Sequence, residues 1–176
     1  MASNEHHYGI NVFWTGNRGT GTSGYKDYGR DHSVTAVGLP TLLGSADRTF
    51  HGDRERWNPE LLLVTALSQC HMLSYLHVAV MRGVVVTTYQ DAATGTMVLN
   101  PDGSGQFSSV TLRPMIGVAD PATEELALTL HAEAARKCFI ARSVNFPVHH
   151  EPGLAEPTED GAACGREGNC QPPTLG

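Results

Sequence analysis

The chain has 176 residues and a mass of 18.9 kDa, and its 40% hydrophobic and 17% charged residues are typical of one folded domain, with or without a tail. It carries 12 Lys and Arg against 18 Asp and Glu, a formal charge of -6. A cationic surface for nucleic acid or anionic lipid is therefore not expected. Aromatic residues make up only 7% of the chain, which also argues against a platform for stacked bases.

The N-terminus lacks the basic segment and apolar stretch of a secretory signal, so we expect a cytoplasmic protein. In that compartment disulfides are usually catalytic or regulatory. The chain has four cysteines: Cys70, Cys138, Cys164 and Cys170. They form no CxxC pair and do not match zinc-finger spacings. The first two fall in sequence that should fold, and the other two fall in a tail.

The N-terminal part of the chain predicts two short strands separated by a long loop. Residues 8–14 alternate and are rich in β-branched and aromatic side chains, which indicates a strand, and a second short strand is expected at residues 33–37. The polar, Gly- and Thr-rich sequence between them predicts a long loop. A second, strongly charged connection follows at residues 44–57.

A long helix is expected to begin at Asn58, which can cap it, with Pro59 and Glu60 in its first turn. Apolar residues fall on every face up to Met81, so the helix should be buried all round. Gly83 is a suitable residue just beyond its end. The length would suffice to cross a bilayer. We reject a membrane span because four polar residues interrupt the run: Gln69, His71, Ser74 and His77.

The C-terminal half predicts three strands, a helix and a last strand. The strands are expected at residues 84–90, 96–99 and 106–118 and should form an antiparallel meander. Asp120 and Pro121 then open a second helix that runs to Lys137. A strand at residues 143–149 precedes the tail, which is too poor in apolar residues to fold. The order ββ-α-βββ-α-β gives an α+β fold, with a domain at residues 1–152 and a flexible tail at 153–176.

The two cysteines of the predicted domain are open to two interpretations. A free cysteine often behaves as a small buried hydrophobe. However, Cys70 lies between Gln69 and His71, and Cys138 follows Arg136 and Lys137. A thiol near cations has a lowered pKa, and the thiolate is the nucleophilic form.

The sequence resembles the OsmC/Ohr family of thiol-dependent hydroperoxide reductases over residues 8–150. The resemblance rests on the run Asn58-Pro59-Glu60-Leu61-Leu62, on Cys70 ten residues after Glu60, and on the segment 137–143 around Cys138. It implies an OsmC-like fold of antiparallel sheets and long buried central helices, in which two chains interleave as a homodimer. It departs from the family at Phe139, where Pro commonly follows the second cysteine, and at His71.

The resemblance also implies the chemistry: a two-cysteine peroxidase without haem, metal or flavin. Cys70 would attack the peroxide and become a sulfenic acid, and Cys138 would resolve it as a disulfide. An external dithiol, in this family often of the lipoyl type, would reduce that disulfide. Glu60 would orient an arginine toward the Cys70 sulfur. We favour Arg30 for this role over Arg48, which lies closer to the OsmC-type position.

Helix geometry restricts how Glu60 can act. Ten residues at about 1.5 Å each place it about 15 Å from Cys70 along a straight helix. Either the helix breaks between them or Glu60 serves the Cys70 of a partner chain, which would require an intertwined dimer with active sites at the subunit interface. His71 could tune Cys70 or face away from it as a core residue.

The sequence leaves other readings open. A non-catalytic dimer could bind an apolar small molecule in a hydrophobic cleft. A metal site could use Cys70, His71, His77 and the segment 149–151, although the usual i, i+4 ligand pair is missing. Cys164 and Cys170 could be incidental thiols or a redox arm. Under the peroxidase reading, apolar or lipid-derived hydroperoxides should be better substrates than hydrogen peroxide, because they have an apolar group to bury.

Overall fold

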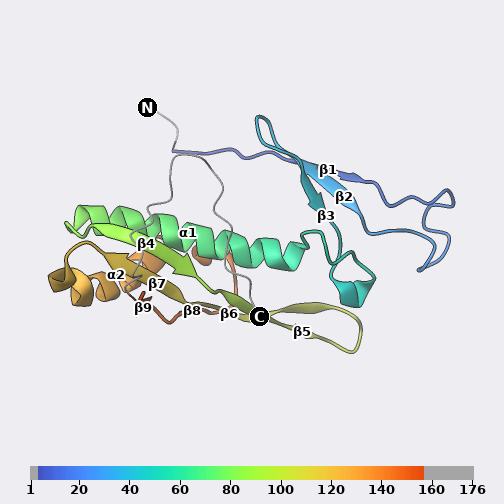
Figure 1. Ribbon diagram of the computed structural model, residues 1–176. Helices are drawn as coiled ribbons and strands as arrows, with labels where there is room; N and C mark the ends of the chain where they lie inside the picture. The colour runs from blue at the N-terminus through green and yellow to red at the C-terminus, as the bar shows by residue number, and fades with distance from the viewer. Residues whose placement is uncertain (1–3, 157–176) are drawn as a thin grey trace.

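Helix α1, Pro59–Met81, begins and ends as the sequence predicts. The Asn58 side chain accepts a hydrogen bond of 2.8 Å from the Leu61 backbone N–H, and Pro59 occupies the first turn. Gly83, just past the end, has a φ of 72°, which a residue without a Cβ adopts at little cost. In this computed structural model, which describes residues 4–156, α1 runs alongside α2 and the strands that follow α1 (Figure 1).

The N-terminal residues form a sheet of their own. Its strands β1 (Asn11–Trp14), β2 (His32–Thr35) and β3 (Leu42–Gly44) pair antiparallel in that order. Strand β3 was not predicted, because three residues are too few to show an alternating pattern. Figure 1 shows this sheet beyond the N-terminal end of α1, apart from the strands that follow α1. All four residues of β1 are exposed.

The strands after α1 form two sheets rather than the expected meander. They are β4 (Val86–Asp91), β5 (Thr94–Leu99), β6 (Gly105–Leu112), β7 (Pro114–Val118), β8 (Val148–His150) and β9 (Gly153–Leu154). The sheet orders are β4-β7-β9 and β5-β6-β8, with β8 and β9 added parallel to their neighbours. The prediction of a meander is wrong because the expected strand 106–118 breaks at Arg113. The Arg113 backbone N–H donates to the Asp91 carboxylate at 2.7 Å, and Pro114 has no N–H.

Helix α2, Glu124–Lys137, lies where a second helix is expected. Asp120 accepts a hydrogen bond of 3.0 Å from the Ala122 backbone and opens a 3₁₀ turn, Pro121–Thr123, that leads into α2. Another 3₁₀ turn, Ala141–Ser143, stands at the start of the expected strand 143–149 and shortens it to β8. The element order is therefore βββ-α-ββββ-α-ββ, and the prediction of an α+β fold is confirmed. Strand β9 falls at the start of the predicted tail, whose residues 157–176, with Cys164 and Cys170, lie outside the described residues.

Helix α1 buries one side only, so the prediction that it is buried all round is wrong for the single chain. The buried side packs on α2 and the sheets through Leu67, His71, Tyr75, Val78 and Ala79. The opposite side leaves Leu61, Leu73 and Val80 between 51% and 74% exposed. By length and composition alone α1 could also cross a membrane, a test that core helices of soluble proteins pass too.

Candidate active site

The structure brings Cys70 and Cys138 together. Cys70 lies midway along α1 and is half-buried, whereas Cys138 follows the last residue of α2 and is only 1% exposed. The two helices pack against each other, and the Cys70 thiol is near enough to raise the pKa of Cys138. Both cysteines are free. Two free thiols separated by 67 residues of chain therefore lie near each other in the fold.

Cys138 is held by the chain that turns away from α2. Its backbone is extended, its N–H donates to the Ala135 carbonyl at 3.4 Å, and its sulfur accepts a hydrogen bond of 3.4 Å from the Ala141 backbone. Burial, together with a smaller contribution from the neighbouring Cys70 thiol, raises the pKa of Cys138 to about 11. The Cys138 thiol therefore keeps its proton at neutral pH.

The basic residues before Cys138 do not lower its pKa, contrary to the expectation from the sequence. Lys137 is paired with Glu133 at 2.9 Å on the exposed side of α2, and Arg136 is exposed as well. Burial raises the pKa of the Cys138 thiol because it disfavours the charged thiolate. The two cations do not offset this effect, because they are exposed and water screens their charge.

Glu60 lies in the first turn of α1 and is half-buried. Its Oε2 atom is buried, and no hydrogen-bond partner reaches it among the described residues. Helix α1 runs unbroken from Pro59 to Met81, so about 15 Å of helix separates Glu60 from the Cys70 of its own chain. Of the two alternatives posed by the sequence, a break in the helix is thus excluded.

Arg30 lies just before β2, and its guanidinium turns back onto its own loop. Nη1 donates to the Tyr28 carbonyl at 2.6 Å and Nη2 to the Tyr25 carbonyl at 2.7 Å. The same group lies 4.2 Å from the centroid of the Tyr28 ring and 4.5 Å from that of Tyr25. Arg48 is exposed in the 3₁₀ turn Arg48–Phe50. These contacts bring neither arginine to the Cys70 of this chain.

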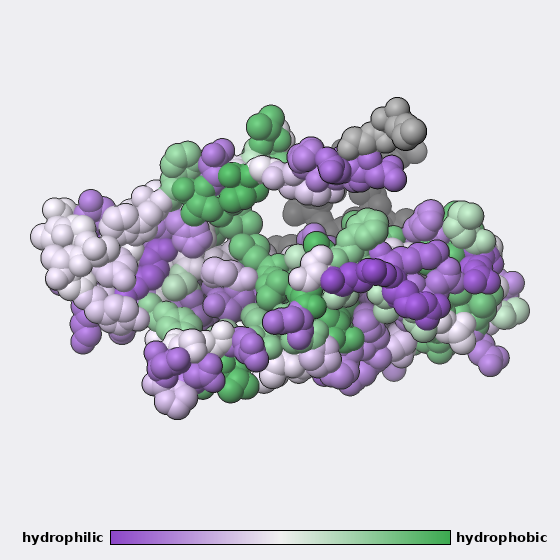
Figure 2. All heavy atoms as spheres, turned by 180° about the vertical axis from the view of Figure 1, so that it is seen from behind, coloured by the Kyte–Doolittle hydropathy of each residue, from purple (hydrophilic) through white to green (hydrophobic). Residues whose placement is uncertain are grey.

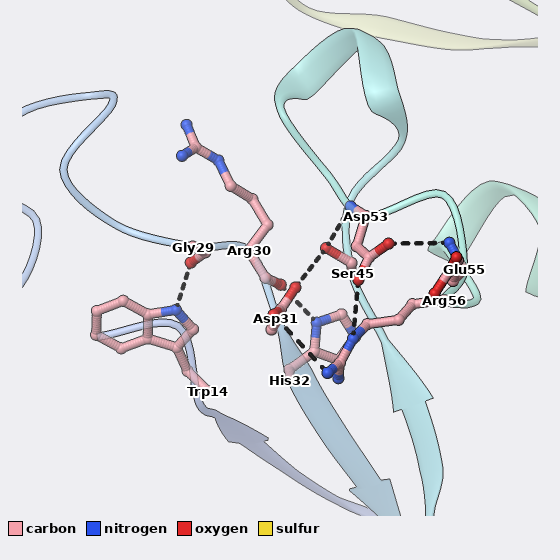
Figure 3. Close-up of polar contacts among 9 residues, drawn as sticks. All are labelled: Trp14, Gly29, Arg30, Asp31, His32, Ser45, Asp53, Glu55 and Arg56. Carbon is pink, nitrogen blue, oxygen red and sulfur yellow. Dashed lines mark hydrogen bonds and ion pairs between the residues drawn. The ribbon is translucent and has the colours of Figure 1, made fainter. Parts of the chain in front are cut away.

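A polar network next to Arg30 ties the N-terminal sheet to the segment that leads into α1 (Figure 3). Buried Ser45 donates to Asp31 at 3.1 Å and accepts from the Asp53 backbone at 3.1 Å. Arg56 is paired with Asp53 at 3.4 Å and with Asp31 at 3.8 Å. In Figure 3 the Arg30 side chain points away from this network. The backbone that carries Arg30 is therefore fixed relative to the segment before Glu60, while its side chain lies on another face.

Two buried histidines and one partly buried histidine form a cluster between α1, α2 and β8. His71 of α1 shares a hydrogen bond of 3.0 Å with His131 of α2, between Nε2 and Nδ1, and its ring lies 4.3 Å from the ring of His150 of β8. The sequence singled out His71 and His150 but missed His131. The pattern that would have revealed it is the buried stripe of α2, because His131 shares that stripe with Ala127, Leu130 and Ala134.

The metal-site alternative gains no support from this cluster. Among residues 4–156, no group of three His, Cys, Asp or Glu side chains is placed to hold a metal ion. His77, which that alternative also required, is exposed on α1.

Comparison with known proteins identifies the family to which this α+β fold belongs. The family model for OsmC-like proteins matches residues 51–152. Because this match spans more than half of the chain, the protein belongs to the OsmC-like family. A search of curated protein sequences finds no match.

Solved structures show the same fold. An OsmC-like protein of unknown function from Vibrio cholerae is 28% identical, with a TM-score of 0.74, and the match covers 84% of this chain and 99% of that one. An organic hydroperoxide resistance protein from Legionella pneumophila is 16% identical, with a TM-score of 0.64 and coverages of 86% and 98%. An organic hydroperoxide resistance protein from Bacillus subtilis is 17% identical, with a TM-score of 0.59 and coverages of 85% and 98%.

Proposed function

We propose that this protein is a peroxidase that reduces organic hydroperoxides with Cys70 as the attacking thiol and Cys138 as the resolving thiol. The observation that carries the proposal is the proximity of two free thiols, one half-buried and one fully buried. Because buried Cys138 keeps its proton, the nucleophile of the pair is Cys70. Membership of a family that includes hydroperoxide resistance proteins supports the same chemistry.

The reaction proceeds in two steps. In the first, the Cys70 thiolate attacks the peroxide, so that an S–O bond forms and the O–O bond breaks. The alkoxide that leaves takes up a proton and becomes an alcohol, and Cys70 is oxidised to a sulfenic acid. In the second, the Cys138 sulfur attacks the Cys70 sulfur, so that an S–S bond forms, the S–O bond breaks and water leaves with the Cys138 proton.

A homodimer with shared active sites explains features that the single chain leaves incomplete. Helix α1 exposes Leu73 and Val80, and strand β1 exposes Phe13. Figure 2 shows hydrophobic residues gathered along the middle of the molecule and at the base of the N-terminal sheet. Apolar surface of this extent marks an interface. We infer that a second copy covers it, and that Glu60 and Arg30 serve the Cys70 of the partner subunit.

In this dimer the buried Oε2 of Glu60 receives the donor that the single chain does not supply. A guanidinium is the natural partner, because its planar fork matches a carboxylate with two hydrogen bonds. Arg30 uses two of its five N–H donors within its own loop and keeps three. The pair would hold Cys70 as a thiolate by placing a cation near its sulfur.

The proposal extends to the substrate and the reductant. Phe139, directly after Cys138, is 80% exposed, so an alkyl hydroperoxide would gain free energy by burying its tail against this side chain. Hydrogen peroxide has no such tail and should be the poorer substrate. The disulfide is reduced by exchange with an external dithiol, for which a lipoyl-type group is the proposed reductant, and no bound cofactor takes part.

The experiment is a peroxide-consumption assay with three cysteine variants. Cys70→Ser should abolish turnover of cumene hydroperoxide. Cys138→Ser should consume one equivalent per chain rapidly and then stop, because the sulfenic acid is no longer resolved by its partner. Cys170→Ser, which alters a thiol of the tail, is the matched control and should turn over normally. Equal residual turnover in Cys70→Ser and Cys138→Ser would contradict the assignment of roles.

A second candidate function is the binding of an apolar small molecule without catalysis. It is favoured by an apolar hollow at the C-terminal end of α1, lined by Leu76, Ala79, Val80 and residues 83–86. The hollow lies about two to three helical turns from Cys70, so a ligand held there would not reach the thiols. Unreactive cysteines together with saturable binding of a fatty acid would favour this candidate over the peroxidase.

A further inference from the structure

The buried histidine cluster places polar side chains in the core, where apolar side chains could be buried at a lower cost in free energy. His71 and His131 are 0% and 2% exposed. Their ring centroids lie 5.3 Å apart, and the ring of Tyr75 stacks on that of His131 with a centroid distance of 4.0 Å. The outward nitrogens, His71 Nδ1 and His131 Nε2, are buried without a partner among the described residues. Unpaired buried polar atoms cost free energy, so a structural role in packing alone does not account for this pair.

The chemistry of the pair excludes two obvious uses. A neutral imidazole has one donor nitrogen and one acceptor nitrogen, so the shared hydrogen bond leaves one outward donor and one outward acceptor, whichever ring donates. The pair therefore cannot offer two lone pairs to a metal cation. It is also a poor proton store, because burial lowers the pKa of His71 to about 3 and that of His131 to about 4.

The position of the pair points to its use. His71 follows Cys70 directly on α1, and His131 lies seven residues, or two helical turns, before Cys138 on α2. A second buried hydrogen bond, of 3.3 Å, runs from the Tyr75 hydroxyl to the Ala127 carbonyl. From the first bond to the second, the chain runs four residues forward along α1, from His71 to Tyr75, and four residues back along α2, from His131 to Ala127. The helices are therefore antiparallel, and the two hydrogen bonds fix one register between them.

That register matters because disulfide geometry is narrow. The two Cβ atoms of a disulfide lie about 3.5–4.5 Å apart, whereas a slide of one residue along a helix moves a side chain by about 1.5 Å. Apolar contacts do not define a register this closely, because they have no direction. A hydrogen bond between two stacked rings has both a length and a direction.

We propose that the hydrogen bond between His71 and His131 positions α2 along α1 so that Cys138 meets Cys70 and the disulfide closes rapidly. The proposal deepens the peroxidase function above and rests on it for its purpose. His71 and His131 are positioning residues, since their hydrogen bond and ring contacts are with each other and with Tyr75 and His150 rather than with the thiols. Other groups that face the cluster are Tyr75 of α1, Tyr89 and Asp91 of β4, and His149 and His150 of β8.

The test separates a directional hydrogen bond from simple packing with two double variants. In the first, His71→Leu with His131→Leu, the apolar side chains fill the space but form no bond. The second double variant is His71→Gln with His131→Asn. The Gln amide is as many bonds from Cα as Nε2 of His71, and the Asn amide is as many bonds from Cα as Nδ1 of His131, so the hydrogen bond is retained. Urea denaturation and circular dichroism establish that each variant is folded.

Two rates are measured for each folded variant. Sulfenic acid formation with cumene hydroperoxide is followed by dimedone trapping at Cys70, and disulfide closure is followed by mass spectrometry of the Cys70–Cys138 peptide pair. We expect sulfenic acid to form within about twofold of the wild-type rate in both variants, and closure to slow by about tenfold or more in the leucine variant. Closure in the Gln/Asn variant should return to within about threefold of wild type. Closure at the wild-type rate in the leucine variant, or equally slow closure in both, would overturn the proposal.

Diamide makes the test independent of peroxidase activity. Its N=N bond takes two electrons and two protons from the two thiols, so that the S–S bond forms without a sulfenic acid. If the wild type does not react with hydroperoxides, the proposed function fails, and slower diamide closure in the leucine variant still supports positioning. If the leucine variant does not fold, His131→Gln replaces it, because the extra methylene displaces the amide from the Nδ1 position. The His131→Gln variant should close the disulfide more slowly than the wild type. Closure at the wild-type rate in this variant would overturn the proposal.

Discussion

Acid should destabilise this protein well before its carboxylates are protonated, because two histidines are buried in their neutral form. The pKa of His71 is about 3 and that of His131 about 4 in the folded chain, against about 6.5 when the chain is unfolded. The stability that depends on the neutral rings is fully present above pH 6.5 and is lost as the pH falls toward the folded values. At pH 5 the unfolded rings are protonated and the folded rings are not. Each histidine then costs about 2 kcal/mol, or about 4 kcal/mol for the pair.

This figure depends mainly on the unfolded pKa, since any folded pKa below about 4 gives nearly the same loss at pH 5. His150, whose pKa burial also lowers, adds to the loss in the same direction. Urea denaturation at pH 7.5 and pH 5.0 measures the change in the free energy of unfolding. The variant His71→Gln with His131→Asn serves as the control, because it carries the same carboxylates but lacks both titrating rings. The wild type should lose about 4 kcal/mol more than this variant, and an equal loss would refute the reasoning.

Three further predictions concern the dimer, the core and the helix cap. Mixing Cys70→Ser with Glu60→Ala chains should restore up to about a quarter of wild-type peroxidase activity, because half of the dimers are then mixed and each mixed dimer has one complete site out of two. No recovery of activity would contradict a site shared between subunits. Leu67→Ala, at a fully buried position, should lower the free energy of unfolding by about 2–5 kcal/mol in urea, against less than about 1 kcal/mol for Leu126→Ala at a 41% exposed position. Asn58→Ala should cost about 1 kcal/mol by the same assay, and Asn58→Asp, which keeps the cap, much less.

The helices were predictable because residues at or near their ends have strong local conformational preferences. Asn58, Pro59 and Gly83 specify the ends of α1, and Asp120 specifies the approach to α2, because caps and φ preferences act within a few residues. Strand pairing was not predictable in the same way. The break at Arg113 depends on a bond to Asp91, twenty-two residues away, and no local pattern reports a contact of that range.

The sequence singled out Cys70, Cys138 and the NPE segment through the resemblance to the family, and their catalytic roles stay predictions. The pKa of Cys138 could not be predicted from the sequence, since it depends on burial by side chains distant in sequence rather than on the adjacent Lys137. The partnership of His71 with His131 was hidden for the same reason, sixty residues apart in the chain. The exposed side of α1 could not be predicted, because apolar residues on every face of a helix do not tell which faces are covered within the single chain.

The most direct test of the central claim is mass spectrometry of the reduced protein after one equivalent of cumene hydroperoxide, with each cysteine mapped in the digest. We predict that a Cys70–Cys138 disulfide forms within seconds, with Cys164 and Cys170 unchanged. Four unmodified thiols would contradict the peroxidase function, and a disulfide that joins Cys70 to Cys164 or Cys170 would contradict the role of Cys138.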